Sequence, residues 1–176
     1  MTIMDRLVTA SEALFDRHGF TATGMDKLTQ SAGISSRTLY KHAGSKNALI
    51  VAVLSARDRR FEAQMMQVKS IAGLFDALEE WVNVEGARGC LFLRAQGETG
   101  GEVTEINEAV SAHKTRVRKR IEALVSDETG GQSDPILADQ ILILFEGATA
   151  AAVYRSGQAV AAARQAAATL MAGAGS

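Results

Sequence analysis

Basic and hydroxyl side chains gather in one short stretch of the sequence, and these residue types contact phosphates and base edges. This stretch, residues 35–46, contains no Asp or Glu, and its basic side chains are Arg37, Lys41, His42 and Lys46. An arginine can bond guanine through two donors, and a lysine offers phosphate a point charge. The first 46 residues carry six Lys and Arg side chains against four Asp and Glu side chains, although the whole chain has a formal net charge of −1. The pattern indicates a local basic face, which acts over a Debye length of roughly 8–10 Å.

The sequence holds no pattern typical of a catalytic or metal site. There is no Gly-rich phosphate loop, no Gly-X-Ser-X-Gly and no HExxH, and the histidines His18, His42 and His113 fall in different expected helices. We therefore expect no catalytic residue, no metal and no cofactor. The single cysteine, Cys90, excludes an intramolecular disulfide, and apolar runs such as 141–145 are far too short to span a membrane. We expect a cytoplasmic protein without membrane contact.

The elements that must position the basic face are helices. Apolar residues recur at helical spacing along the chain, which contains one proline. A short apolar segment at 90–93 fits either a strand or a buried helix turn. We predict an all-α fold, in which residues 1–46 form a three-helix helix-turn-helix DNA-binding domain. Residues 47–176 then form a larger helical domain for ligand binding and dimerisation.

The helix-turn-helix is predicted from its capping and turn residues. Thr23, followed three residues later by Asp26, has the pattern of a capping box that opens the second helix. Gly33 suits a turn that needs a positive φ, and Ser35 can cap a third helix over 36–42. A small core would fix the angle between the two helices, and its members are Met25, Leu28, Ala32, Ile34 and Leu39.

A second helix held in this way can lie in a DNA major groove with its N-terminal residues toward the bases. Arg37 is the candidate for base contact, while Tyr40 and Lys41 are candidates for phosphate contact. Ser45 caps a fourth helix that begins at Lys46, where free backbone N–H groups attract an anion. The expected DNA-binding residues are Thr23, Ser35, Ser36, Arg37, Thr38, Tyr40, Lys41, His42 and Lys46.

The segment from Gly19 to Leu49, GFTATGMDKLTQSAGISSRTLYKHAGSKNAL, resembles the DNA-binding domain of the TetR family of repressors. The matching pieces are the GF that ends the first helix, AGIS at the turn, TLYKH in the recognition helix and SK at the next helix start. Two positions depart from the family, because Ala43 stands where an aromatic residue is usual and Arg37 where a glycine is common. The resemblance implies a homodimer on duplex operator DNA, a repressor by default, and release by a small-molecule effector that the sequence does not identify.

The predicted helix 135–154 is apolar nearly all round, which indicates burial on two sides. By resemblance, this helix and the Ala-rich helix at 160–171 would form a four-helix bundle with a second copy. The alternative is that both helices are ordinary core of a monomer. The expected interface stripe is Leu137, Ile141, Leu144, Phe145, Ala148 and Ala152.

The larger domain is also expected to hold the effector pocket, in line with the usual mixture of apolar and a few polar side chains. For His113 and Trp81 a place in the core is the more ordinary interpretation. Cys90 could act as a thiol redox sensor, although a buried structural thiol is favoured. A small helical enzyme or binding protein, whose N-terminal motif only packs, is the remaining alternative. The candidate pocket residues are Phe75, Leu78, Trp81, Cys90, Phe92, Arg94, His113, Val117, Phe145 and Glu146.

Overall fold

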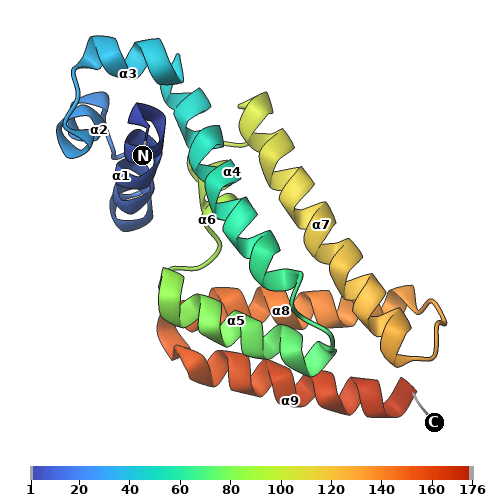
Figure 1. Cartoon of the computed structure of the whole chain (residues 1–176). Helices are drawn as coiled ribbons and strands as arrows, with labels where there is room; N and C mark the ends of the chain where they lie inside the picture. The colour runs from blue at the N-terminus through green and yellow to red at the C-terminus, as the bar shows by residue number, and fades with distance from the viewer. Residues whose placement is uncertain (1, 175–176) are drawn as a thin grey trace. The chain divides into compact units, whose positions relative to one another are not determined.

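The computed structural model describes residues 2–174, and all regular structure in this part of the chain is α-helical. This confirms the predicted all-α class. The helices of Figure 1 are α1 (Ile3–His18), α2 (Met25–Ala32), α3 (Ser36–Ala43), α4 (Lys46–Met65), α5 (Ile71–Glu85), α6 (Leu91–Glu98), α7 (Thr104–Glu128), α8 (Pro135–Arg155) and α9 (Gly157–Ala174).

The chain divides into two compact units. Unit 1 contains the residues up to Arg60 together with Leu91–Ala112, and unit 2 contains Phe61–Cys90 and the residues from His113 onward. Helices α4 and α7 therefore each contribute to both units, and α6 belongs to the N-terminal one. The predicted domain boundary after residue 46 does not coincide with the limits of these units. The assignment of DNA binding and effector binding to its two sides stays a prediction.

Unit 1 begins with a helix whose two ends are set by local chemistry. The Thr2 hydroxyl accepts from the Asp5 amide while the Asp5 carboxylate accepts from the Thr2 amide, which is a complete capping box. At the other end Gly19 adopts φ 87° and closes the helix by donating to the Phe15 carbonyl. The buried rings of Phe15 and Phe20 stack with centroids 4.8 Å apart. The core of unit 1 thus reaches directly beneath the α1–α2 turn.

The helix-turn-helix forms as predicted, with one correction at its start. Gly33 lies in the left-handed region at φ 63° and ends α2, and the Ser35 hydroxyl accepts from the Thr38 amide to cap α3. The N-cap of α2 is Gly24, however, and no side chain caps this helix. The predicted capping box of Thr23 is therefore wrong, because the Thr23 hydroxyl donates to the Gly19 carbonyl instead.

Unit 2 is a helical bundle in which α8 packs on α9 and both pack on α5. The predicted start of α8 is confirmed, since the Asp134 carboxylate accepts from the Leu137 amide and Pro135 takes the first helical position. The C-terminal half of α7 adds its apolar residues, Ile121 and Leu124 among them, to the same core. The bundle is therefore built around one continuous apolar cluster.

Two apolar segments of uncertain character are resolved by the structure. The segment at 90–93 begins helix α6 and is not a strand. Among the described residues, α8 is the one helix long and apolar enough to cross a membrane by length and composition, with a mean hydropathy of 1.6 over its most apolar window. Only 33% of that window is buried within the chain, and core helices of ordinary globular proteins pass the same test.

Candidate nucleic-acid interface

Helix α3 turns one face into unit 1 and leaves the other open. Leu39 is fully buried and Ala43 is 8% exposed, so these two residues form the inner face. The predicted reading residue Arg37 is exposed, and so is Lys41 four residues later. Tyr40 is 52% exposed, which is unusual for a large aromatic side chain in a small helix. Exposed positions on α3 and its cap are Ser35, Ser36, Arg37, Tyr40, Lys41 and His42, while Thr38 is half-buried.

Ala43 sits where an aromatic residue is usual in the resembling family, and the structure shows how the position is filled. Its small side chain is buried on the inner face of α3, next to the turn at Gly44 that leads into α4. The Ser45 hydroxyl then accepts from the Ala48 amide and caps α4, as predicted. The junction between α3 and α4 is thus held by caps as well as by packing.

Thr23, expected among the DNA-binding residues, lies in the interior of unit 1. Its side chain is fully buried, and its hydroxyl donates to the Gly19 carbonyl over 2.7 Å. This bond ties the residue before α2 to the end of α1. Thr23 therefore shapes the α1–α2 turn and does not present its hydroxyl at the surface.

Lys46 begins α4 and is half-buried, and its ammonium group reaches back toward the α1–α2 turn. Lys46 Nζ donates to the Thr21 carbonyl over 3.5 Å. Desolvation by burial lowers the pKa of Lys46 below its ordinary value, and the nearby Glu98 carboxylate opposes this by favouring the charged form. The backbone N–H groups of the first turn of α4 and the Lys46 ammonium group each favour a nearby anion.

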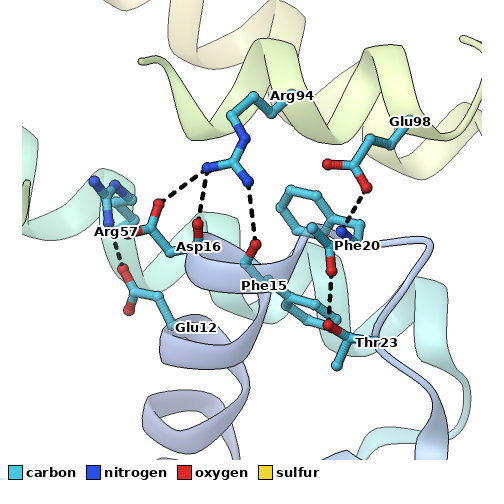
Figure 2. Close-up of polar contacts among 9 residues, drawn as sticks. Glu12, Phe15, Asp16, Phe20, Thr23, Arg57, Arg94 and Glu98 are labelled. Atoms are coloured by element: carbon cyan, nitrogen blue, oxygen red, sulfur yellow. Dashed lines mark hydrogen bonds and ion pairs between the residues drawn. The ribbon is translucent and has the colours of Figure 1, made fainter. Parts of the chain in front are cut away.

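Arg94 of helix α6 forms hydrogen bonds with the C-terminal end of α1 (Figure 2). Arg94 Nη1 donates to the Asp16 carbonyl over 3.1 Å and to Asp16 Oδ1 over 3.2 Å, and Arg94 Nη2 donates to the Phe15 carbonyl over 3.3 Å. The last carbonyls of a helix carry partial negative charge, so a cation is favoured there. Arg94, a candidate residue of the effector pocket, thus bonds α1 within unit 1, and its place in a pocket stays a prediction. Phe92, on the same helix, is also a buried residue of unit 1.

A second ion-pair group joins α1 to α4. Glu12 Oε1 accepts from Arg57 Nη1 over 3.0 Å and from Arg60 Nη2 over 2.5 Å (Figure 2 draws the Arg57 contact). Arg57 is only 5% exposed. The sequence analysis missed these residues, because partners separated by more than forty positions leave no local pattern. The charged residues of the middle of α4 could have been noticed only as an interruption of its apolar spacing.

The remaining predicted effector residues lie in unit 2, and most of them are core. Phe75, Leu78, Val117 and Phe145 are all buried in its apolar cluster. Phe61, which the prediction omitted, forms edge contacts with the rings of Trp81, His113 and Phe145 at centroid distances of 5.2, 5.3 and 6.4 Å. The interpretation of Trp81 and His113 as aromatic core residues agrees with this packing.

The two other predicted pocket residues meet in a small polar group of unit 2. Lys114 Nζ donates to both carboxylate oxygens of Glu146 over 2.7 Å and to Cys90 Sγ over 3.4 Å. Cys90 is partly buried and forms no disulfide. Among the described residues no group of three or more His, Cys, Asp or Glu side chains could hold a metal ion.

The predicted dimer stripe on α8 faces the chain's own core. Five of its six residues are at most 5% exposed, and Leu144 is half-buried beside the same cluster. The neighbouring stripe of α8 is open instead, with Ile136 74%, Ile143 70% and Tyr154 77% exposed. Two shallow apolar grooves of about 440 and 370 Å³ run between α8 and α9, and Ile143 and Leu144 line both.

Comparison with known proteins gives the same assignment for the N-terminal region. Residues 7–53 match the family described as bacterial regulatory proteins, tetR family. The transcriptional activator FasR of Mycolicibacterium smegmatis is 48% identical over 48 residues, which are 27% of this chain and 22% of FasR. An HTH-type transcriptional regulator of Mycobacterium tuberculosis, MT1294, is 29% identical over 118 residues, 61% of this chain and 57% of the relative. The chain thus aligns with less than two thirds of each of these relatives.

Solved structures extend the likeness over the whole fold. SCO4454, a TetR-family transcriptional regulator from Streptomyces coelicolor, superposes with a TM-score of 0.86 at 24% identity, covering 99% of this chain and 96% of that one. The protein sav143 of Streptomyces avermitilis, a proposed TetR transcriptional regulator, gives 0.83 at 26% identity, with 99% and 98% covered. Because these proteins are regulators, the alternative of a helical enzyme is set aside. Residues 7–53 therefore match a tetR-family domain, and the full fold is that of solved TetR-type regulators.

Proposed function

We propose that this protein is a transcriptional regulator that binds operator DNA through α3. The observation that carries the proposal is the two-faced character of this helix. Leu39 and Ala43 fix its inner face, while its outer face presents Arg37, Tyr40 and Lys41 to solvent without an acidic neighbour on the helix. A helix presented in this way fits a major groove, whose edges carry a distinct donor and acceptor pattern for each base pair.

The exposed residues divide into base-reading and phosphate-binding roles. Arg37 lies in the first turn of α3, from which its guanidinium can reach O6 and N7 of a guanine. Tyr40, Lys41 and Lys46 are proposed to hold phosphates, with the first amides of α4 adding donors beside Lys46. The hydroxyls of Ser35 and Thr38 bond each other over 2.9 Å and are available at the start of the same helix. His42 is proposed as a peripheral contact at the end of α3.

A homodimer is proposed from the unsatisfied apolar surface of α8. This helix has the composition of a fully covered helix, yet its chain buries only a third of the most apolar window. The exposed stripe with Ile143 borders the two apolar grooves between α8 and α9, and these grooves continue over small alanine side chains of α9. A second copy of the same surface fits this pattern, since symmetric dimers use one patch twice. The interface is therefore moved from the stripe predicted from sequence to its outward neighbour.

Repression relieved by a small-molecule effector, in the cytoplasm, is the remaining part of the proposal. Its support is the tetR match over residues 7–53 together with the half-buried group of Cys90, Lys114 and Glu146 in unit 2. A ligand that bound there could alter DNA affinity only by favouring one of two conformations of the dimer. The alternative of thiol-based regulation draws on the same group, because Cys90 Sγ accepts from Lys114 Nζ over 3.4 Å.

The DNA-binding proposal is tested by titrating the full chain with a duplex recovered by genomic selection and with a scrambled duplex of equal length. We expect the logarithm of the association constant to fall linearly with the logarithm of salt concentration. Lys46→Ala should reduce that slope by about one, as expected for the loss of one phosphate contact. Lys119→Ala, which removes an exposed lysine of α7 in unit 2, is the matched control and should leave the slope unchanged.

Binding that is absent for the selected duplex, or insensitive to salt, would contradict the proposal. Arg37→Ala separates base reading from phosphate binding. The variant should lose about 1–3 kcal/mol at one base pair of each half-site and little elsewhere. Equal weakening on selected and scrambled duplexes would make Arg37 a phosphate contact.

A further inference from the structure

The carboxylate of Glu98 lies against the turn that joins α1 to α2, far from it in sequence (Figure 2). Glu98 Oε2 accepts from the Phe20 amide over 2.6 Å and from the Thr21 amide over 2.9 Å. A third bond runs in the other direction, because the Thr21 hydroxyl donates to the Glu98 carbonyl over 3.0 Å. Hydrogen bonds to an ionised acceptor are shorter and stronger than neutral ones. The end of α6 therefore holds the turn with both side chain and backbone.

Gly19 leaves open the space that this carboxylate occupies. A Cβ atom at Gly19 would lie 2.8 Å from Glu98 Oε2 and 3.0 Å from Oε1, closer than any Cβ placed at another described glycine would come to its neighbours. Gly19 also has φ 87°, a backbone conformation that favours glycine. The glycine that ends α1 thus has a second role, since it permits a carboxylate to reach the two amides that follow.

The turn held by Glu98 also contacts Lys46, the residue proposed to bind a DNA phosphate. Lys46 Nζ donates to the Thr21 carbonyl over 3.5 Å, while the Thr21 amide donates to Glu98. On the inner side Thr23 bonds the Gly19 carbonyl, and the Phe20 ring stacks on Phe15 in the core. One short segment therefore connects α6, the start of α2 and the start of α4 within unit 1.

We propose that Glu98 is a positioning residue for the DNA-binding surface. Its carboxylate fixes the Phe20 and Thr21 amides and thereby the position of the Thr21 carbonyl. Because Lys46 donates to that carbonyl, Glu98 also sets the position of the Lys46 ammonium group at the start of the helix-turn-helix. Without this acceptor two amides would lose their partner, and the turn would have to be ordered again each time DNA binds. The proposal rests on the DNA contact proposed above for Lys46.

The first test compares Glu98→Ala and Glu98→Gln with matched changes at Glu102, an exposed acid of the loop after α6. Glu98→Ala and Glu98→Gln should both shift the amide proton signals of Phe20 and Thr21 in NMR spectra relative to the wild type, because each change alters the acceptor of these amides. In Glu98→Ala both amides should exchange with solvent at least about tenfold faster, the ratio expected for one hydrogen bond. The Glu102 variants should leave both signals unchanged.

The second readout is affinity for the duplex recovered by genomic selection, measured on folded protein. Glu98→Ala should bind about tenfold more weakly, a loss of the size of one charge-assisted hydrogen bond. Glu98→Gln keeps an oxygen acceptor and should weaken binding about threefold, with Glu102→Gln as its control. The Gln variant decides the question if the Ala variant does not fold.

Gly19→Ala approaches the same contact from the other side. Its Cβ would displace the carboxylate, so the loss of affinity in Gly19→Ala should be smaller in a Glu98→Ala background than in the wild type. Strict additivity of the two changes would overturn the proposal. So would Glu98 variants that bind the duplex like their Glu102 controls although their amides exchange faster, since Glu98 would then be purely structural. Wild-type protein that does not bind DNA at all would overturn the proposed function itself, which separates that failure from one of Glu98 alone.

Discussion

At the scale of single residues, hydroxyl and carboxylate caps mark where several helices of this protein begin, α3, α4 and α8 among them. Ser35 caps α3 through the Thr38 amide, and Ser45 caps α4 through the Ala48 amide. Such caps satisfy backbone donors that have no partner inside the helix. Because α3 has only eight residues, the first turn is a large share of its hydrogen bonds. The stability of α3 should therefore depend on Ser35 more than on any other exposed residue of this helix.

Ser35→Ala should lower the free energy of unfolding by about 1 kcal/mol, because the Thr38 amide loses its acceptor. Chemical denaturation of the full chain, followed by circular dichroism, measures this change. Ser36→Ala is the matched control, since Ser36 is also exposed but occupies the first helical position. Its effect should stay within a few tenths of a kcal/mol. Equal effects of the two changes would show that the Ser35 cap does not determine the start of α3.

Lys46 predicts a pH dependence of DNA binding. Burial lowers its pKa, so its ammonium loses the proton below the ordinary value of 10.5. A DNA phosphate favours the charged form, so binding raises this pKa and takes up a proton. Affinity for the selected duplex should consequently fall as pH rises from neutral toward 10.5. In Lys46→Arg, whose guanidinium stays charged, this part of the decline should be missing. Parallel curves for the two proteins would contradict the assignment of Lys46 as a phosphate ligand.

At the scale of elements, α6 belongs with the helix-turn-helix although it lies about seventy residues further along the chain. Its arginine binds the last carbonyls of α1, and its glutamate binds the first amides after that helix. The two side chains carry the charges that complement these groups, because a helix ends in carbonyls of partial negative charge. Helix α6 therefore holds the junction between α1 and the helix-turn-helix through both side chains.

Arg94→Ala should lower the free energy of unfolding by about 2–4 kcal/mol. The variant leaves the Asp16 carboxylate, which is 7% exposed, and the last α1 carbonyls without this donor. Arg94→Lys should recover only part of the loss, since one ammonium cannot span the carbonyls and the carboxylate together. Arg37→Ala, an exposed arginine of the same unit, should change stability by less than about 0.5 kcal/mol. An Arg94→Ala protein as stable as Arg37→Ala would show that the Arg94 contacts add nothing to the stability of unit 1.

The same elements show what the sequence could and could not predict. Gly33, Ser35 and Asp134 were predictable because a cap or a left-handed turn is decided within a few residues. The Arg94 and Glu98 contacts were not, since their partners are 77 to 79 positions away and only the fold brings them together. Thr23 was misjudged because a hydroxyl before a helix can bond backward, to the Gly19 carbonyl, as well as forward.

Helix α8 carries the same lesson for whole helix faces. Its all-round apolarity predicted burial on two sides, and the structure buries one of them. The periodicity could not tell which side faces its own chain. The stripe with Ile141 and Phe145 turned out to be the inner one. Only packing against α5 and α9 settles the orientation, and that packing depends on residues outside α8.

At the scale of the whole molecule, the open stripe of α8 connects quaternary structure to DNA recognition. One recognition helix contacts a single groove segment, whereas two helices carried by a dimer can contact successive major grooves about 34 Å apart. The apolar stripe with Ile143, Tyr154 and the grooves beside α9 would be covered in such a dimer. A contiguous exposed apolar patch often marks an interaction site, whereas single exposed apolar residues are normal on a protein surface. Loss of the dimer should therefore cost operator affinity without any change in α3.

Ile143→Glu tests this connection, with Met66→Glu as the matched control. The two side chains are 70% and 69% exposed, but Met66 follows α4 and lines neither of the two grooves between α8 and α9. Sedimentation velocity should find the wild type and Met66→Glu as dimers, and Ile143→Glu as a monomer at the same concentration, because a buried carboxylate is costly at an apolar interface. Affinity for the selected two-half-site duplex should fall at least about a hundredfold in Ile143→Glu, while affinity for a scrambled duplex changes far less. A wild type that sediments as a monomer would contradict the proposed dimer. An Ile143→Glu protein that is still a dimer with full operator affinity would show that the two copies meet at another surface.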